Sequence, residues 1–128
     1  MKSYEPVTMW VEDAQIAIVS DSPVEAIDIA DTAKSAGFGP ILLMRSASAL
    51  SSLMESKELR PRLVVVTKSL DDSEASAVID RCREARASII WVDDNARATE
   101  DDRVQTLMRP FGVDEVRSAF DRAGLRSA

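Results

Sequence analysis

The chain predicts an α/β fold in which helices cover both faces of a parallel sheet. Short apolar segments recur along the sequence, and they alternate with segments whose apolar residues repeat at helical spacing. Strands that are apolar throughout are typical of parallel sheets, because both of their faces are buried. The 128 residues, 45% of them hydrophobic, suit a single domain with one core.

The first strand and helix are expected at residues 16–19 and from Pro23 onward. Ser22 precedes the helix as a cap, proline is favoured at the first helical position, and Glu25 follows three residues after the serine. This pattern is a capping box, and such a cap typically stabilises a helix by about 1 kcal/mol. Gly37 is expected to end the helix. The apolar residues at helical spacing are Ala26, Ile29, Ala30 and Ala33.

Two further pairs of strand and helix follow. Residues 41–44 form the second expected strand, after which Ser46 can cap a helix. Residues 63–67 form the third strand, after which Asp72 or Ser73 can cap another helix. The positions expected to face inward are Ala49, Leu50, Leu53 and Met54 in the first of these helices and Ala75, Val78, Ile79, Cys82 and Ala85 in the second.

The last part of the chain completes the pattern with a shortened crossover. Residues 88–92 form a fourth strand, and residues 105–108 a weaker fifth. Asn95–Val104 leaves ten residues between them, although a parallel crossover usually takes about a dozen, so a fourth helix here should be short, irregular or absent. A closing helix that stops at Gly124 is marked by Val113, Val116, Phe120 and Ala123. Five such units predict a flavodoxin-like (βα)5 sandwich with strand order 2-1-3-4-5, in which the loops after strands 1 and 3 meet.

Residues 1–14 are expected to form an N-terminal arm, and residues 15–128 the folded domain. Tyr4, Met9 and Trp10 give the arm more apolar surface than a solvated tail needs. We therefore expect the arm to pack on the domain or on a second copy of the chain.

The composition argues against several functions. The net charge of −6, with lysine and arginine spread along the chain, would repel nucleic acid. The absence of histidine removes serine–histidine and cysteine–histidine catalysis. Cys82 is the only cysteine, so it can form neither an internal disulfide nor a paired metal site, and its helical position predicts a core residue. With no signal peptide and no apolar run near the roughly 20 residues that span a bilayer, we expect a cytoplasmic protein without membrane contact.

Four segments carry a family resemblance. They are IAIVSDSP at residues 16–23, LVVVT at 63–67, SIIWVDD at 88–94 and LMRPF at 107–111. In order and spacing, over nearly the whole stretch from Ile16 to Ala123, they resemble the receiver domain of bacterial two-component response regulators. The resemblance implies a phosphate pocket with four parts. These are an acidic pair after strand 1, a phosphoacceptor aspartate after strand 3, a hydroxyl residue after strand 4 and a lysine followed by proline after strand 5.

This chain departs from that pocket at most positions. Thr67 stands at the phosphoacceptor and lacks the carboxylate that receives the phosphoryl group. Asp21 is the one carboxylate left of the usual three, so magnesium affinity should be poor. Asp93 stands where a hydroxyl belongs and would repel a phosphoryl group. We therefore expect no catalytic residue, no metal site, no cofactor and no enzyme activity. The full set of degenerate pocket residues is Ser20, Asp21, Thr67, Asp93, Thr106 at the usual switch aromatic, and Arg109 at the lysine.

Arg109 is expected to close this pocket permanently. Arginine stays charged and offers a planar fork of donors that grips carboxylates. Asp21 and Asp93 are its expected partners, in a fixed ion pair that takes the place of the contact between phosphoaspartate and lysine. The alternative is an Arg109 that points into solvent without a partner.

These features favour a stand-alone pseudo-receiver that acts as a phosphorylation-independent protein–protein interaction module in bacterial signal transduction. The expected partner is another protein, of unknown identity, or a second copy of the chain. The expected contact face is residues 95–104, Thr106 and the closing helix. One alternative is a small-molecule or nucleotide sensor that uses the crevice where the first and third loops meet. Another is phosphorylation of Thr67, Ser69 or Ser73 by a serine/threonine kinase.

Overall fold

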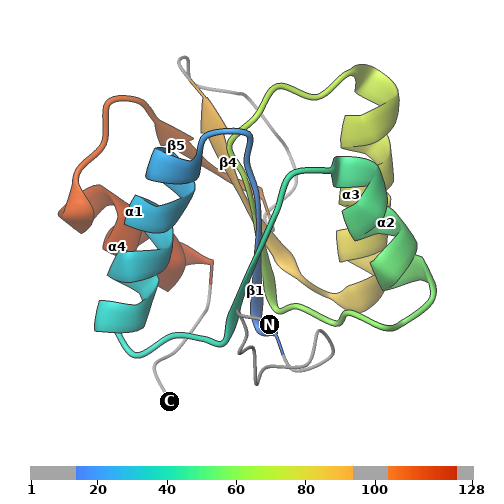
Figure 1. Ribbon diagram of the computed structural model, residues 1–128, viewed down its shortest axis with the longest axis horizontal. Helices are drawn as coiled ribbons and strands as arrows, with labels where there is room; N and C mark the ends of the chain where they lie inside the picture. Colours follow the sequence, from blue (N-terminus) through green and yellow to red (C-terminus); the bar gives the residue numbers. More distant parts are fainter. Residues whose placement is uncertain (1–13, 94–103, 124–128) are drawn as a thin grey trace, which may run out of the picture.

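The computed structural model describes residues 14–93 and 104–123, which form an α/β domain of three layers (Figure 1). The elements in chain order are β1 (Ile16–Val19), α1 (Pro23–Ser35), β2 (Ile41–Met44), α2 (Ala47–Glu55), β3 (Leu63–Val66), α3 (Asp72–Ala85), β4 (Ser88–Asp93), β5 (Val104–Met108) and α4 (Val113–Arg122). Residues 1–13 of the expected arm and residues 95–103 of the expected crossover lie outside the described residues. Ala14, the last residue of the expected arm, is buried in the core.

The sheet is parallel throughout, and its strand order is β2-β1-β3-β4-β5. This order confirms the flavodoxin-like topology predicted from the sequence. Val19 lies opposite both Met44 and Val66, so β1, β2 and β3 end level at one carboxyl edge. In Figure 1 the helices α1 and α4 lie on one side of the sheet, and α2 and α3 lie on the other.

Two apolar cores fill the spaces between the sheet and the helices, because alternate residues of a strand point to opposite faces. Ile18 belongs to the core beneath α1 and α4, where the rings of Phe38 and Phe120 meet edge to face with centroids 5.5 Å apart. Ala17 belongs to the core beneath α2 and α3, together with Leu50. The all-apolar strands are therefore explained by burial on both faces.

Cys82 is a core residue, as the sequence predicts. Its side chain is 1% exposed and packs in the core beneath α2 and α3. Burial raises the pKa of the thiol from 9.0 to about 12, because a thiolate would lose its hydration there. The side chain therefore stays protonated at physiological pH.

The start of α3 differs from the prediction. Its N-cap is Asp71, rather than Asp72 or Ser73. Asp71 Oδ1 accepts a hydrogen bond from the backbone N–H of Glu74 at 2.7 Å, and Glu74 Oε1 accepts one from the backbone N–H of Asp71 at 3.2 Å. This reciprocal capping box satisfies two backbone donors at once, so Asp71 is the N-cap and α3 begins at Asp72.

Several helix positions expected to face inward are exposed: Ala49, Ala85 and Val113. The buried stripe of α2 is instead Ala47, Leu50 and Met54, whose spacings of three and four residues follow one face of a helix. On α4, burial begins one turn later, at Val116. β5 begins at Val104, one residue earlier than predicted. The described helices have 9 to 14 residues, and none is long and apolar enough to cross a membrane.

Candidate functional site at the carboxyl edge of the sheet

Four of the residues singled out by the sequence lie where neighbouring strands end. Ser20 follows β1, Thr67 follows β3, Asp93 ends β4 and Arg109 follows β5. Backbone hydrogen bonds hold the strand ends together: the N–H of Thr67 donates to the carbonyl of Val19 at 2.9 Å, and that of Arg109 to the carbonyl of Asp93 at 2.8 Å. The topology therefore brings these four positions to one edge of the sheet, as the resemblance implies.

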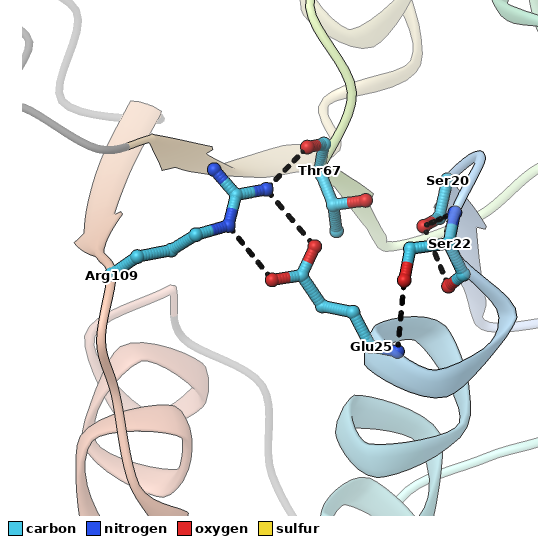
Figure 2. Close-up of polar contacts among 5 residues, drawn as sticks. All are labelled: Ser20, Ser22, Glu25, Thr67 and Arg109. Atoms are coloured by element: carbon cyan, nitrogen blue, oxygen red, sulfur yellow. Dashed lines mark hydrogen bonds and ion pairs between the residues drawn. The ribbon is translucent and has the colours of Figure 1, made fainter.

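Arg109 forms a bidentate ion pair with Glu25 of α1 (Figure 2). Its Nε donates to Glu25 Oε2 at 2.8 Å, and its Nη2 donates to Glu25 Oε1 at 2.9 Å. The same Nη2 also donates to the backbone carbonyl of Thr67 at 2.6 Å. The Arg109 side chain is 31% exposed and that of Glu25 is 19% exposed. One guanidinium thus joins the start of α1 to the ends of β3 and β5.

An ion pair of Arg109 was expected with Asp21 and Asp93, and the structure gives Glu25 as a carboxylate partner in place of Asp21. Asp21 is exposed to solvent. Asp93 is half-buried, and its backbone carbonyl accepts a hydrogen bond from the N–H of Arg109. The carboxylate that grips the guanidinium belongs to Glu25, which the sequence analysis assigned to a capping box. The alternative of a solvated Arg109 without a partner is also wrong.

Ser20 accepts the hydrogen bond that Glu25 would accept in the predicted capping box. Ser22 does cap α1, since its Oγ accepts a hydrogen bond from the backbone N–H of Glu25 at 3.4 Å. In a complete box, the Glu25 carboxylate would accept from the backbone N–H of Ser22. Here that N–H donates to Ser20 Oγ at 3.0 Å, and Ser20 Oγ donates to the carbonyl of Ser22 at 3.1 Å. Ser20 therefore organises the turn, and the Glu25 carboxylate is left to bind Arg109.

Thr67 is buried at the phosphoacceptor position, with 5% of its surface exposed. Its Oγ1 is buried and has no hydrogen-bond partner among the described residues. A hydroxyl needs an adjacent base to become a good nucleophile, and none contacts Thr67 Oγ1 in that part of the chain. Burial also argues against modification of Thr67 by a kinase in the folded state, whereas Ser69 and Ser73 are exposed.

Comparison with known proteins bears on the fold. No protein-family model and no curated protein matches the chain. Among solved structures, the response regulator PhyR from Brucella abortus matches with a TM-score of 0.68 and 20% identity, over 87% of this chain and 47% of that one. A response regulator receiver domain protein from Bacillus halodurans matches with a TM-score of 0.64 and 21% identity, over 84% of this chain and 94% of that one. The chain has a receiver-like fold.

The similarity of this chain to these solved structures concerns the fold alone. A de novo designed Rossmann 2x3 protein also matches, with a TM-score of 0.60 and 14% identity, over 84% of this chain and 86% of that one. The same shape therefore occurs in a designed protein as well as in response regulators. This chain also spans only 47% of the PhyR structure from Brucella abortus. Its function has to be argued from its own residues.

Thr106 is the remaining pocket residue expected from the sequence. Thr106 lies within β5 opposite Trp91, and it lines a hollow between β5 and α4. In the described ranges, no three side chains of His, Cys, Asp or Glu gather as a metal site requires. Lys68 lies at the carboxyl edge, where its Nζ donates to the carbonyl of Arg45 at 3.0 Å.

Proposed function

We propose that this receiver-like domain is a protein-interaction module of a signalling pathway, and that its state does not depend on phosphorylation of an aspartate. The observation that carries the proposal is the contact of Arg109 with Glu25 and with the carbonyl of Thr67. The family resemblance implies a lysine at this position that meets a phosphorylated aspartate. Here the cation is already held by groups of the protein itself, so the link between the ends of β3 and β5 forms without phosphate.

Arginine suits a permanent link better than lysine does. Its guanidinium does not lose its charge in the physiological range, and its planar fork binds a carboxylate through two parallel hydrogen bonds. The acceptors are a carboxylate on α1 and a backbone carbonyl, neither of which is added or removed by a kinase or a phosphatase. The proposed role is therefore a constant surface for binding rather than a switch or a catalyst.

The face made by β5 and α4 offers a surface for a protein partner. β5 is an edge strand of the sheet, and Met108 on it is 48% exposed. Beside it lies a hollow of about 480 Å³, lined by residues that include Thr106, Met108 and Pro110 on one side and Asp114, Ser118 and Arg122 on α4. An edge strand offers unpaired backbone N–H and carbonyl groups with which another chain can pair, and Met108 adds exposed apolar area beside them. This face includes two parts of the contact region expected from the sequence.

The chemical half of the proposal is tested with acetyl phosphate and magnesium. Intact-mass measurement should show no gain of a phosphoryl group on this protein, because Thr67 offers a buried hydroxyl without a base. A receiver domain that carries the phosphoacceptor aspartate, treated in parallel, serves as the positive control. A phosphoryl gain that disappears in Thr67→Ala would show that the domain is a working receiver and would overturn the proposal.

The binding half is tested by affinity capture from the native host with three baits. The wild type should retain one reproducible protein, and Met108→Asp should lose it, because a carboxylate would replace the exposed apolar contact. Leu43→Asp is the matched control, since Leu43 is 46% exposed on β2, the strand at the opposite edge of the sheet. Equal capture by Met108→Asp and the wild type would exclude the face of β5 and α4 as the contact surface.

A further inference from the structure

A cluster of arginines lines a hollow at the amino edge of the sheet, the edge opposite to Arg109. The hollow has a volume of about 400 Å³. Its lining includes Arg60, Pro61 and Arg62 from the segment between α2 and β3, Arg86 at the end of α3, Ser88 of β4 and Ala123 at the end of α4. Among the residues that the structure describes, no carboxylate side chain contributes to the lining. In a chain with a net charge of −6, three arginines around one hollow form a local concentration of positive charge.

The backbone around the hollow is held firmly. The N–H of Arg62 donates to the carbonyl of Gln15 at 2.8 Å, and the N–H of Ser88 donates to the carbonyl of Arg62 at 2.9 Å. Ser88 Oγ also donates to the carbonyl of Ala123 at 2.8 Å, which fastens the end of α4 to the start of β4. Pro61 is buried between the two arginines of its segment. The backbone that carries the three arginines is therefore held by hydrogen bonds. A ligand would need to order only the arginine side chains.

These arginines lack the partners that other arginines of the protein have. Arg109 is paired with Glu25 at 2.8 Å, and Arg81 with Glu84 at 3.0 Å. In residues 14–93 and 104–123, no carboxylate lies within ion-pair distance of the three arginines around the hollow. Like charges brought together without a counter-charge repel each other, which opposes folding. An anion at the hollow would remove that repulsion.

Arg86 has a backbone conformation that few residues other than glycine adopt, as Lys57 after α2 also has. It caps the end of α3 in the left-handed region, with φ of 59° and ψ of 34°. Glycine or asparagine is the usual residue there, because a larger side chain is strained in that conformation. A cation at a helix C-terminus is stabilised by the helix dipole, and this accounts for Arg86 alone. It does not account for Arg60 and Arg62, which precede β3 rather than ending a helix.

We propose that this hollow binds the phosphate groups of a small phosphorylated molecule. Guanidinium forks match the geometry of phosphate oxygens, and three of them can neutralise a group that carries two or three negative charges. A hollow of about 400 Å³ lies within the range of volumes of small-molecule sites. The site is separate from the carboxyl edge, so it would remain if the proposed interaction role were wrong.

The test is isothermal titration calorimetry with inorganic pyrophosphate as the probe, in about 0.1 M NaCl to screen distant charges. The wild type should show one site and a higher melting temperature in the presence of pyrophosphate. Arg62→Gln and Arg86→Gln should each weaken binding by roughly tenfold, because each removes a charge-assisted contact. Arg62→Gln should melt no lower than the wild type without ligand, because it also reduces repulsion between like charges. Arg45→Gln is the control, since Arg45 is exposed beyond the carboxyl end of β2 and its change removes the same charge.

Three outcomes would overturn the proposal. One is the absence of both binding heat and a shift in melting temperature with pyrophosphate. Another is an equal loss of affinity in Arg45→Gln, which would mean that general charge, not the hollow, attracts the anion. The third is binding of a short oligonucleotide or an acidic peptide by a protein that ignores pyrophosphate, which would assign the arginines to a macromolecule.

Discussion

At the scale of single residues, the pair of Arg109 and Glu25 joins three elements at the carboxyl edge, and its strength can be measured. Arg109→Ala should lower the free energy of unfolding by about 2 kcal/mol. This lies between the roughly 0 to 1 kcal/mol of exposed pairs and the roughly 3 to 5 kcal/mol lost when a buried charge loses its partner. The intermediate value follows from the partial exposure of both side chains, 31% and 19%. Urea denaturation monitored by tryptophan fluorescence gives the number.

The matched control for this prediction is Asp80→Ala. Asp80 lies 3.7 Å from Arg83 in a pair whose two side chains are about 60% exposed, so its loss should cost less than about 0.5 kcal/mol. A double-mutant cycle with Glu25→Ala should assign most of the Arg109 effect to the pair itself. Equal losses for the Arg109 and Asp80 variants would show that the contact at the carboxyl edge does not hold the elements together.

The same residues show how far the sequence could define the site. Thr67, Asp93 and Arg109 could be placed because each follows or ends an apolar strand, and the ends of parallel strands meet at one edge. Glu25 could not be placed in this way, because its local pattern with Ser22 already had a sufficient explanation as a capping box. Its true partner lies 84 residues away. A signal did exist, since a carboxylate in the first turn of α1 stands at the same edge of the sheet as the strand ends.

At the scale of elements, the start of α3 gives a second prediction. Asp71→Ala should lower the free energy of unfolding by about 1 kcal/mol, because it removes the side chain that accepts from the N–H of Glu74. Asp72→Ala should cost only a few tenths of a kcal/mol, since Asp72 interacts with the helix dipole without closing the box. Thermal or urea melts of both variants compare them directly. A larger loss of unfolding free energy for Asp72→Ala than for Asp71→Ala would mean that Asp72, as predicted from the sequence, is the N-cap of α3.

The sequence predicted whether each described element is a helix or a strand, but it did not always predict which face of a helix is buried. The sequence of α2 is compatible with more than one buried face. Ala49, Leu50, Leu53 and Met54 have helical spacing, and this spacing alone predicted that they face inward. The structure buries Ala47 and leaves Ala49 exposed, because the packing of α2 on the sheet and on α3 decides the rotation of the helix. Alanine contributes little apolar area, so its position in a sequence carries little information about rotation.

At the scale of the whole molecule, the strand order was predictable for physical reasons. Short strands that are apolar on both faces must lie between two layers of helices, and right-handed crossovers allow few arrangements of five such units. The hollow lined by arginines was not predictable, since Arg60, Arg62 and Arg86 are separated along the chain by unremarkable residues. Only the register of β3 and β4 brings them together, with Leu63 opposite Ser88.

The buried thiol of Cys82 allows the stability of the whole fold to be followed. Its pKa is raised to about 12, so this contribution to stability is complete below about pH 9 and is lost as the pH rises toward 12. Near neutral pH, a thiol reagent should modify native Cys82 at least about a thousandfold more slowly than unfolded chain, because reaction requires opening of the core. An exposed cysteine, Ser69→Cys in a Cys82→Ser background, serves as the reference for free access. Modification of native Cys82 at the reference rate would mean that α3 separates from the sheet without global unfolding.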